Sequence, residues 1–337
     1  NDMFSGDVLT VATSSGVFSD ARAATGKTVS ISGITLGGTD AGNYTLTTST
    51  ASTTATIDPK ALTVTALSQT KVYDSNTSVA SNALNVGYSV GTMIGSESLS
   101  GVTLAYSGAN VSRDGSGAVL SDKTITVSAA QAGSGTVLSD YAISYVNNTM
   151  STITPFAVSL AGTRVYDATT AVAASNFTIG TLVGSETLSL TGSGTLADKN
   201  VGQNKAVGLG TLTLVDGTAG GLASNYALTG SRTATITQAA VTVTTSDVVK
   251  TYDGTLSVAG ATTAASPIVL AGSNTQMFGG DTLSGGSYAF TDANAGSGNR
   301  TVTVAGVSIN DGNSGGNYTV TFASNTTSTI DPKALTV

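Results

Sequence analysis

Four short patterns recur in a fixed order along the 337 residues, and this repetition constrains the fold more than any other feature. The clearest pattern, TIDPKALTV, stands at residues 56–64 and again, unchanged, at 329–337. Weaker copies lie between them, as TITPFAVSL (152–160) and TITQAAVTV (235–243). The isoleucines of the four copies lie 96, 83 and 94 residues apart, which indicates a tandem array of similar units.

The other three patterns keep their places relative to these junctions. A Tyr-Asp pattern follows a junction, an Asn-Tyr or Asp-Tyr pattern precedes it, and a glycine with a nearby acidic residue lies in mid-unit. The copies are KVYD (71–74), RVYD (164–167) and KTYD (250–253); GNYTL (42–46), SDYAI (139–143), SNYAL (224–228) and GNYTV (316–320); FSGDVL (4–9), IGSESL (94–99), VGSETL (183–188) and FGGDTL (278–283). We therefore expect a partial unit at 1–58, whole units at 59–154, 155–237 and 238–331, and the start of a further unit at 332–337.

Hydrophobic residues alternate with a period of two inside the units. In ALTVTAL (61–67), Leu62, Val64 and Ala66 point to one side and the threonines to the other. Forty-one glycines and many β-branched residues accompany this pattern, whereas helix-favouring residues are scarce. The sequence thus predicts an all-β protein of tandem antiparallel β-sandwich domains, Ig-like or related. Prolines at three of the short junctions (Pro59, Pro155 and Pro332) favour a stiff connection and an extended rod.

Composition excludes several classes of function. The chain has no cysteine and no histidine, so disulfides, thiolate metal sites and the commonest general base are missing. Its net charge is −7 without basic clusters, which argues against nucleic-acid binding. No apolar run approaches the roughly 20 residues that a membrane-spanning helix needs. We therefore expect neither an enzyme nor a membrane-spanning protein.

The Tyr-Asp patterns carry a resemblance to a known family. KVYDSNT, RVYDATT and KTYDGTL resemble the signature of YDG domains, and segments 40–64 and 197–243 resemble the rest of YDG/MBG-type repeats. Only 252–254 spells the three letters; Ser75 and Ala168 replace the glycine elsewhere. Such repeats occur in large secreted bacterial adhesins similar to filamentous haemagglutinin. The resemblance implies an extracellular stalk at the outer face of a Gram-negative cell.

Seven tyrosines recur with the patterns and suggest, at first sight, a carbohydrate-binding ladder. They are Tyr44, Tyr73, Tyr141, Tyr166, Tyr226, Tyr252 and Tyr318. We expect instead that each anchors a core, with its ring buried and its hydroxyl bound to backbone. The aspartates that follow three of them, Asp74, Asp167 and Asp253, precede small residues and predict Asx turns.

Two charged positions also recur. The acidic one holds Asp7, Glu97, Glu186 and Asp281, and the basic one holds Lys71, Arg164 and Lys250. An intramolecular Lys–Asn isopeptide bond would strengthen a stalk, but Arg164 lacks the amine that this reaction needs. Surface or rim ion pairs, worth about 0–1 kcal/mol each, are the simpler interpretation.

Two loops rich in Asp and Asn place oxygens at alternating positions, a pattern that can hold Ca²⁺. They are DANAGSGN (292–299) and DGNSGGN (311–317). Neither contains the glutamate that closes an EF-hand loop, so turn formation is the main interpretation and calcium the alternative. No other cofactor, metal site or catalytic group is predicted.

The sequence predicts a structural spacer of a bacterial surface adhesin, which projects a binding region for adhesion or biofilm formation and contacts chiefly its own neighbouring repeats. Two alternatives stay open. In the first, the repeats themselves bind a host receptor or matrix glycan. In the second, head-to-tail self-association completes the partial unit by strand addition from another copy and builds a fibre.

Overall fold

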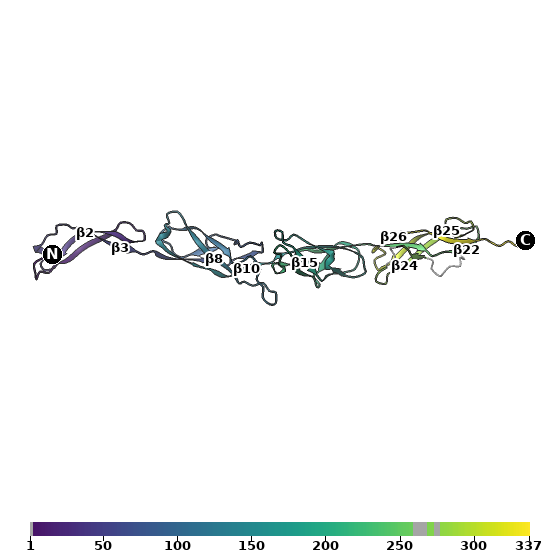
Figure 1. Cartoon of the computed structure of the whole chain (residues 1–337), viewed down its shortest axis with the longest axis horizontal. Helices are drawn as coiled ribbons and strands as arrows, with labels where there is room; N and C mark the ends of the chain where they lie inside the picture. The colour runs from purple at the N-terminus through teal and green to yellow at the C-terminus, as the bar shows by residue number, and fades with distance from the viewer. Residues whose placement is uncertain (1–2, 259–267, 273–276) are drawn as a thin grey trace. The chain divides into compact units, whose positions relative to one another are not determined.

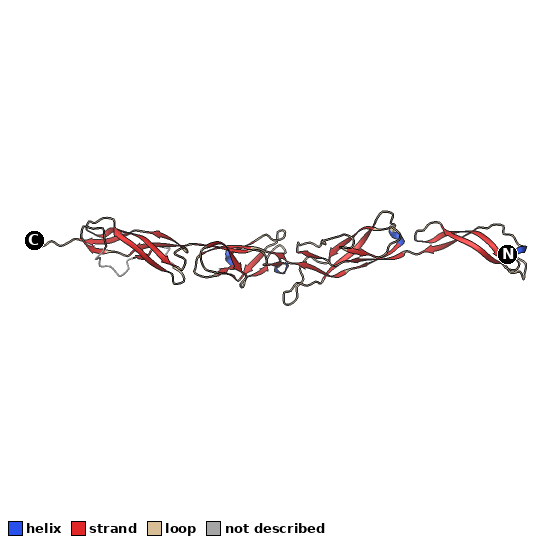
Figure 2. Cartoon of the chain, turned by 180° about the vertical axis from the view of Figure 1, so that it is seen from behind, coloured by secondary structure: helices blue, strands red, loops and turns tan. Residues whose placement is uncertain are grey.

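The computed structural model describes residues 3–258, 268–272 and 277–337. The chain divides into two compact units, Asn1–Pro155 and Phe156–Val337, and each is considered by itself. Strands carry the regular structure of both units (Figures 1 and 2). The helical elements of the described residues are single 3-10 turns: η1 (Ala41–Asn43), η2 (Leu138–Asp140), η3 (Ala174–Asn176) and η4 (Ala223–Asn225). The prediction of an all-β chain is confirmed.

Residues 3–58 contain one three-stranded antiparallel sheet in the order β1-β2-β3. Its strands are β1 (Thr10–Phe18), β2 (Ala24–Gly37) and β3 (Ala51–Ile57). Both ends of β1 carry apolar side chains in solvent, since Val11 and Val17 are each 63% exposed. This sheet therefore has little core of its own.

Residues 59–154 form two sheets, in the orders β6-β4-β9 and β5-β10-β8-β7. The strands are β4 (Lys60–Ala66), β5 (Thr70–Val72), β6 (Tyr88–Val90), β7 (Leu99–Tyr106), β8 (Lys123–Ala132), β9 (Tyr141–Val146) and β10 (Asn148–Thr154). Leu62, Val64 and Ala66 of β4 are buried, and the threonines between them lie on its other face. The predicted period of two is confirmed for this strand.

The next repeat, 155–237, forms three sheets, whereas 59–154 forms two. They are β11-β19, β15-β18 and the six-stranded β13-β16-β17-β20-β12-β14. Its strands are β11 (Phe156–Ala157), β12 (Leu160–Val165), β13 (Ala171–Ala173), β14 (Phe177–Ile179), β15 (Leu188–Thr191), β16 (Ser193–Leu196), β17 (Gly202–Gly208), β18 (Thr213–Asp216), β19 (Tyr226–Ala227) and β20 (Arg232–Thr237). It is the least regular of the repeats.

The described residues of the 238–331 repeat again form two sheets, in the orders β23-β21-β26 and β22-β27-β25-β24. The strands are β21 (Ala239–Thr245), β22 (Val249–Thr251), β23 (Ile268–Leu270), β24 (Thr282–Phe290), β25 (Gly296–Asn310), β26 (Tyr318–Phe322) and β27 (Asn325–Asp331). The strand orders match those of 59–154 position by position. The 15-residue β25 pairs antiparallel with β24 and β27.

The sheets are mixed, whereas the sequence predicts antiparallel ones. The first two strands of each whole repeat pair in parallel with its last two, as β4 with β9 and β5 with β10. The corresponding parallel pairs are β11 with β19, β12 with β20, β21 with β26 and β22 with β27. First and last strands can run in the same direction only if the chain enters a repeat at one end and leaves it at the other, as tandem connection requires.

The cores of the two repeats in Phe156–Val337 are continuous. Tyr166, Val172 and Ile236 of the earlier repeat belong to one buried cluster with Val241 and Tyr318 of the later one. Gln238, which stands where other junctions have proline, holds the start of the later repeat against that repeat, because its side-chain amide donates to the carbonyls of Gly316 and Tyr318. Packing is thus shared across this junction.

Candidate functional site

The Tyr-Asp patterns build the same turn at the start of each whole repeat. The basic residue binds the carboxylate three positions later, in the pairs Lys71–Asp74 (2.6 Å), Arg164–Asp167 and Lys250–Asp253 (2.8 Å). The Lys250 ammonium also donates to the carbonyls of Thr255 and Ser257 at 2.6 and 2.8 Å. Hydrogen bonding by Lys250 lowers the pKa of Asp253 to about 2. The turn is therefore held by an internal cation.

These pairs differ from the predicted surface or rim pairs. The side chain of Lys250 is 2% exposed and that of Lys71 is 7% exposed, although their aspartates are each 42% exposed. The basic stems lie beside the rings of Phe290 and Tyr106, with each ammonium 5.4 Å from the ring centroid. The prediction of a surface location is wrong for the basic residues, because their apolar stems complete the core while the cation binds turn carbonyls.

The predicted Asx turns are confirmed. Each aspartate accepts a hydrogen bond from the backbone N–H two residues later, which belongs to Asn76, Thr169 or Thr255. The residue between them is left-handed, with φ of 62° at Ser75, 61° at Ala168 and 74° at Gly254. Glycine adopts this conformation without the strain that a Cβ atom adds. This geometry accounts for the third letter of the YDG pattern.

A second recurring arrangement joins the tyrosine before each junction to the mid-unit acid. The tyrosine hydroxyl donates to the carboxylate and accepts from the backbone N–H three residues before that acid. The sets are Tyr44 with Asp7 and Phe4, Tyr141 with Glu97 and Ile94, Tyr226 with Glu186 and Val183, and Tyr318 with Asp281 and Phe278. Burial, with the adjacent Glu186, raises the pKa of Tyr226 to about 12. The hydroxyls thus bind carboxylates, which corrects the expectation of backbone partners alone.

Ring burial is also less uniform than predicted. The rings of Tyr73, Tyr141, Tyr166, Tyr226 and Tyr318 are buried, as expected. Tyr252, in contrast, is 40% exposed, although it occupies the same motif position as the fully buried Tyr166. The difference lies in what covers the ring, because the local turns are alike.

Within Asn1–Pro155, a polar contact joins the two repeats. The guanidinium of Arg22 donates to Asp140 Oδ2 at 2.7 Å and lies 3.6 Å from Glu97 Oε1. The backbone N–H of Ala23 donates to the other oxygen of Asp140 at 2.8 Å. Hydrogen bonding from Arg22 lowers the pKa of the Asp140 carboxyl. Glu97 at this contact also accepts a hydrogen bond from the Tyr141 hydroxyl.

Within Phe156–Val337, the corresponding contact is aromatic. The ring of Tyr166 meets that of Tyr318 edge to face, with centroids 5.4 Å apart, and its hydroxyl donates to Asp281 Oδ2 at 3.0 Å. The backbone N–H of Val201 donates to Asn317 Oδ1 at 2.9 Å, matching the Ala23–Asp140 bond. In both contacts, a loop N–H donates to the side chain of the residue immediately before a tyrosine. The repeat ends are therefore complementary surfaces.

The two candidate calcium loops bind their own backbone. Asp311 accepts from the N–H groups of Asn313 and Gly315 through one oxygen and from that of Asn317 through the other. Asp292 accepts from the backbone of Asn294 and pairs with Arg300 at 2.5 Å. No group of three or more Asp, Glu, His or Cys side chains that could hold a metal ion occurs in the part of the chain that is described. Turn hydrogen bonds occupy these oxygens.

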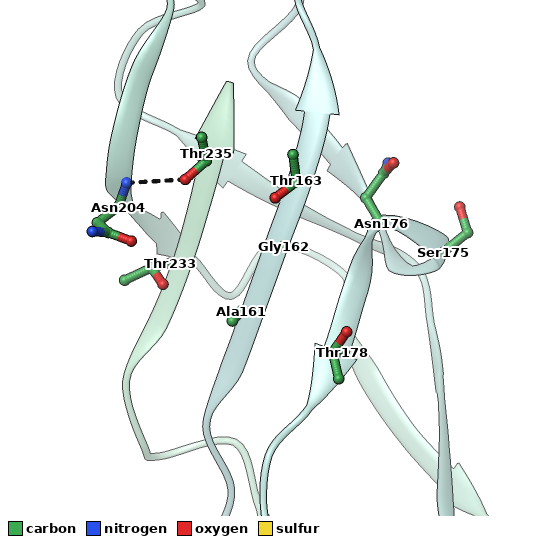
Figure 3. Close-up of a pocket in the computed structure, with 9 residues that line it drawn as sticks. All are labelled: Ala161, Gly162, Thr163, Ser175, Asn176, Thr178, Asn204, Thr233 and Thr235. Atoms are coloured by element: carbon green, nitrogen blue, oxygen red, sulfur yellow. Dashed lines mark hydrogen bonds between the residues drawn. The ribbon is translucent and has the colours of Figure 1, made fainter. Parts of the chain in front are cut away.

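A polar concavity of about 470 Å³ lies over β12, β14 and β20 in the 155–237 repeat (Figure 3). Its side chains include Thr163, Asn176, Thr178, Thr233 and Thr235, which Figure 3 shows on neighbouring strands and the η3 turn. It contains no aromatic ring or charged group on which a sugar or ion would bind specifically. We regard it as the exposed hydroxyl face of a sheet.

Sequence reasoning missed the loop that supplies one side of the contact between repeats within each of the two compact units. Asp20 and Lys27, and Asp198 and Lys205, form an equivalent ion pair in these two loops, and Asp292 and Arg300 form the same pair in the corresponding loop of the 238–331 repeat. The recurring spacing of an acid and a base seven or eight positions apart is visible in the sequence, and it could have located them. Irregular loop residues carry no hydrophobic period, so a search for strands passes over them.

The comparison with protein families is consistent with this repeat. The family model described as YDG domain matches residues 1–53, 149–235 and 237–328, which together make up more than half of the chain. Searches among curated proteins and among solved structures found no match. No helix within the described ranges has the length and apolar character needed to cross a bilayer.

Proposed function

The chain belongs to the YDG domain family, and on this basis we propose that it is a spacer segment of a bacterial surface adhesin. In this role the repeats form an extended rod of Ig-like β-sandwich domains outside a Gram-negative cell. The rod projects a binding region for adhesion or biofilm formation. Its main partners are neighbouring repeats, and it has no catalytic role.

The passage of the chain through each whole repeat is the observation that carries this proposal. Because the opening strands run parallel to the closing ones, entry and exit lie at opposite ends, and every added repeat adds length. Complementary ends, such as Val201 against Asn317, then limit bending between neighbours. A protein with these properties can hold a binding region at a distance from the cell surface.

Surface display tests the proposal directly. Whole repeats 59–154, 155–237 and 238–331 would be inserted between a surface anchor and a small antigen-binding domain on cells coated with a polymer brush. We expect antigen binding through the brush to increase as one, two and three repeats are inserted. A flexible Gly-Ser linker of equal residue number is the control and should perform worse, because a random coil spans a much shorter distance. Binding independent of repeat number would contradict a spacer role.

A glycan array with the purified chain separates the spacer from the alternative receptor-binding role. The spacer proposal expects no saturable binding. Saturable binding that requires one of the exposed tyrosines, for example Tyr252, would favour the receptor-binding role instead.

A further inference from the structure

The three loops that carry an Asp–Lys or Asp–Arg ion pair share one turn. In each, the aspartate accepts a hydrogen bond from the backbone N–H two residues later. The residue that donates this bond has the same place in every loop, and we call it the loop position. It is arginine in the first loop and asparagine in the other two. The donors and acceptors are Arg22 with Asp20 (2.8 Å), Asn200 with Asp198 (2.9 Å) and Asn294 with Asp292 (2.9 Å).

A second position varies in step with the loop position. It is the residue immediately before the tyrosine of each Asn-Tyr or Asp-Tyr pattern, and we call it the end position. Three copies have asparagine there and one has aspartate: Asn43, Asp140, Asn225 and Asn317. Within Asn1–Pro155, the loop arginine contacts this aspartate; within Phe156–Val337, the loop asparagine contacts an asparagine. Both end residues are buried, with Asp140 7% and Asn317 0% exposed.

The Arg–Asp contact matches donors with acceptors. Both oxygens of the Asp140 carboxylate accept, one from the Arg22 guanidinium at 2.7 Å and the other from the backbone N–H of Ala23 at 2.8 Å. A guanidinium has only donors and a carboxylate only acceptors. An asparagine at position 140 would turn its NH₂ group toward one of the two donors. The Arg22 loop therefore fits an aspartate and not an asparagine.

The Asn–Asn contact has a different order of donors and acceptors. The side-chain oxygen of Asn317 accepts from the N–H of Val201 at 2.9 Å and from the amide of Asn313 at 3.0 Å. These two donors orient the Asn317 amide, so that its NH₂ group donates to the Asn200 side-chain oxygen at 3.1 Å. An arginine at position 200 would place its donors against that NH₂ group. This end residue therefore fits a loop asparagine and not a loop arginine.

A neighbouring residue explains how the second contact can keep a neutral loop position. In both contacts a cation lies near the mid-unit acid of the next repeat: Arg22 is 3.6 Å from Glu97, and Lys199 is 3.7 Å from Asp281. Lys199 directly precedes the loop position, whereas Ala21 has this place in the first loop. One arginine thus binds both acids of its partner in the first contact. In the second, Lys199 supplies the cation and leaves the loop position to an amide.

From this matching we propose that the loop and end positions determine which repeats can be neighbours. A loop arginine selects a repeat with aspartate at its end position, and a loop asparagine selects a repeat with asparagine there. A mismatched neighbour would bury donor against donor, which disfavours it. The pairing rule rests on the proposed spacer role for its biological purpose. Its test measures the contacts alone, so a failure of the rule is distinguishable from a failure of the spacer role.

Hydrogen exchange of the full chain tests the rule, because the N–H groups of Ala23 and Val201 each donate to an end residue. Asp140→Asn should lower the protection factor at Ala23 about tenfold or more, since a hydrogen bond to a charged group is lost. Adding Arg22→Asn recreates the Asn–Asn contact. The double variant should recover to within about threefold of the wild type, although independent substitutions would add their losses.

Two observations serve as controls in the same experiment. Protection at Val201, in the other compact unit, should not change in these variants. Protection in β4 reports whether the 59–154 repeat stays folded. Arg22→Asn alone completes the cycle, and because the Arg22 side chain is 50% exposed, this variant leaves the core intact. A double variant that is no better protected at Ala23 than Asp140→Asn would overturn the inference.

The reciprocal exchange tests the rule at the second contact. Asn200→Arg should lower protection at Val201, and Asn317→Asp in the same chain should restore it by recreating the Arg–Asp contact. Asn294→Arg is the matched control, because it adds the same side chain at the loop position of another loop and should leave Val201 unchanged. Protection at Val201 that falls in Asn200→Arg and does not recover with Asn317→Asp would contradict the pairing rule.

Discussion

The turns at Tyr166 and Tyr252 have the same sequence pattern, the same Asx hydrogen bond and the same left-handed third residue, but opposite surroundings. The first is fully buried under the Phe278 and Tyr318 rings, and the second is 40% exposed. The motif thus determines the shape of the turn, whereas the burial of the tyrosine ring depends on the residues that pack against it. Tyr166 is part of the core because the rings of Phe278 and Tyr318 cover it.

The largest difference between the two turns is expected on truncation of their tyrosines. Tyr166→Ala should reduce the free energy of unfolding by about 3–5 kcal/mol, because it empties a closed aromatic site. Tyr252→Ala should change it by about 0.5 kcal/mol or less, as at most exposed sites. Urea unfolding of the full chain, with hydrogen exchange followed in β12 and β22, measures the two effects. Similar reductions in the free energy of unfolding for the two variants would contradict the stated difference between the two turns.

Removal of a buried cation from one of these turns should reduce the free energy of unfolding by less than Tyr166→Ala does. Lys250→Met should reduce the free energy of unfolding by about 1–3 kcal/mol, since the turn carbonyls lose a buried donor. Lys60→Met, at an exposed lysine, is the control and should change little. An equal effect of the two substitutions would show that the Lys250 ammonium does not hold the turn.

The pH dependence of stability provides a second test of the Lys250–Asp253 ion pair. The folded-state pKa of Asp253 is about 2, below its ordinary value of 3.8, so the ion pair stabilises the fold above about pH 4. That contribution is lost as the pH falls from 4 toward 2. The stability difference between the wild type and Lys250→Met should narrow over this range.

Substitution of the left-handed residue of each turn should have the next largest effect on stability. Gly254→Ala should destabilise the 238–331 repeat by about 1 kcal/mol, and Ser75→Gly should stabilise the 59–154 repeat by a similar amount. Gly115→Ala is the control, because its backbone has an ordinary φ and an added Cβ meets nothing within 4 Å. Thermal melts of the three variants suffice. Opposite signs would contradict the assignment of strain to this position.

The smallest effect is expected where two repeats meet without a tyrosine turn. Arg22 lowers the pKa of Asp140, so their bond stabilises the fold above the ordinary carboxyl pKa and is lost as the pH falls below about 4. The hydrogen-exchange protection factor at Ala23, which corrects for the slower intrinsic exchange in acid, should therefore fall at acid pH in the wild type. In Arg22→Gln it should already be low at neutral pH. A protection factor in the wild type that does not change with acid would show that the charge pair does not hold this contact.

The local features of the fold were predictable, and the pairing between distant segments was not. The alternation in β4 and the Asp-small-residue pattern at Asp74 each act within a few residues, so the sequence alone predicts a strand and a turn. Strand direction depends on segments about 80 residues apart, such as β4 and β9, and an alternating pattern is the same for parallel and antiparallel partners. The exposure of Tyr252 depends on a neighbouring surface, which its own sequence does not describe.

The parallel pairing of β5 with β10, and of β22 with β27, has a mechanical consequence. Tension applied along the chain pulls an opening strand and the closing strand beside it in opposite directions, along their common axis. Their interstrand hydrogen bonds are then loaded together in shear, and none can be peeled away one at a time as in a hairpin pulled from its open end. Each repeat should accordingly resist stretching along the chain more strongly than a hairpin that is pulled from its open end.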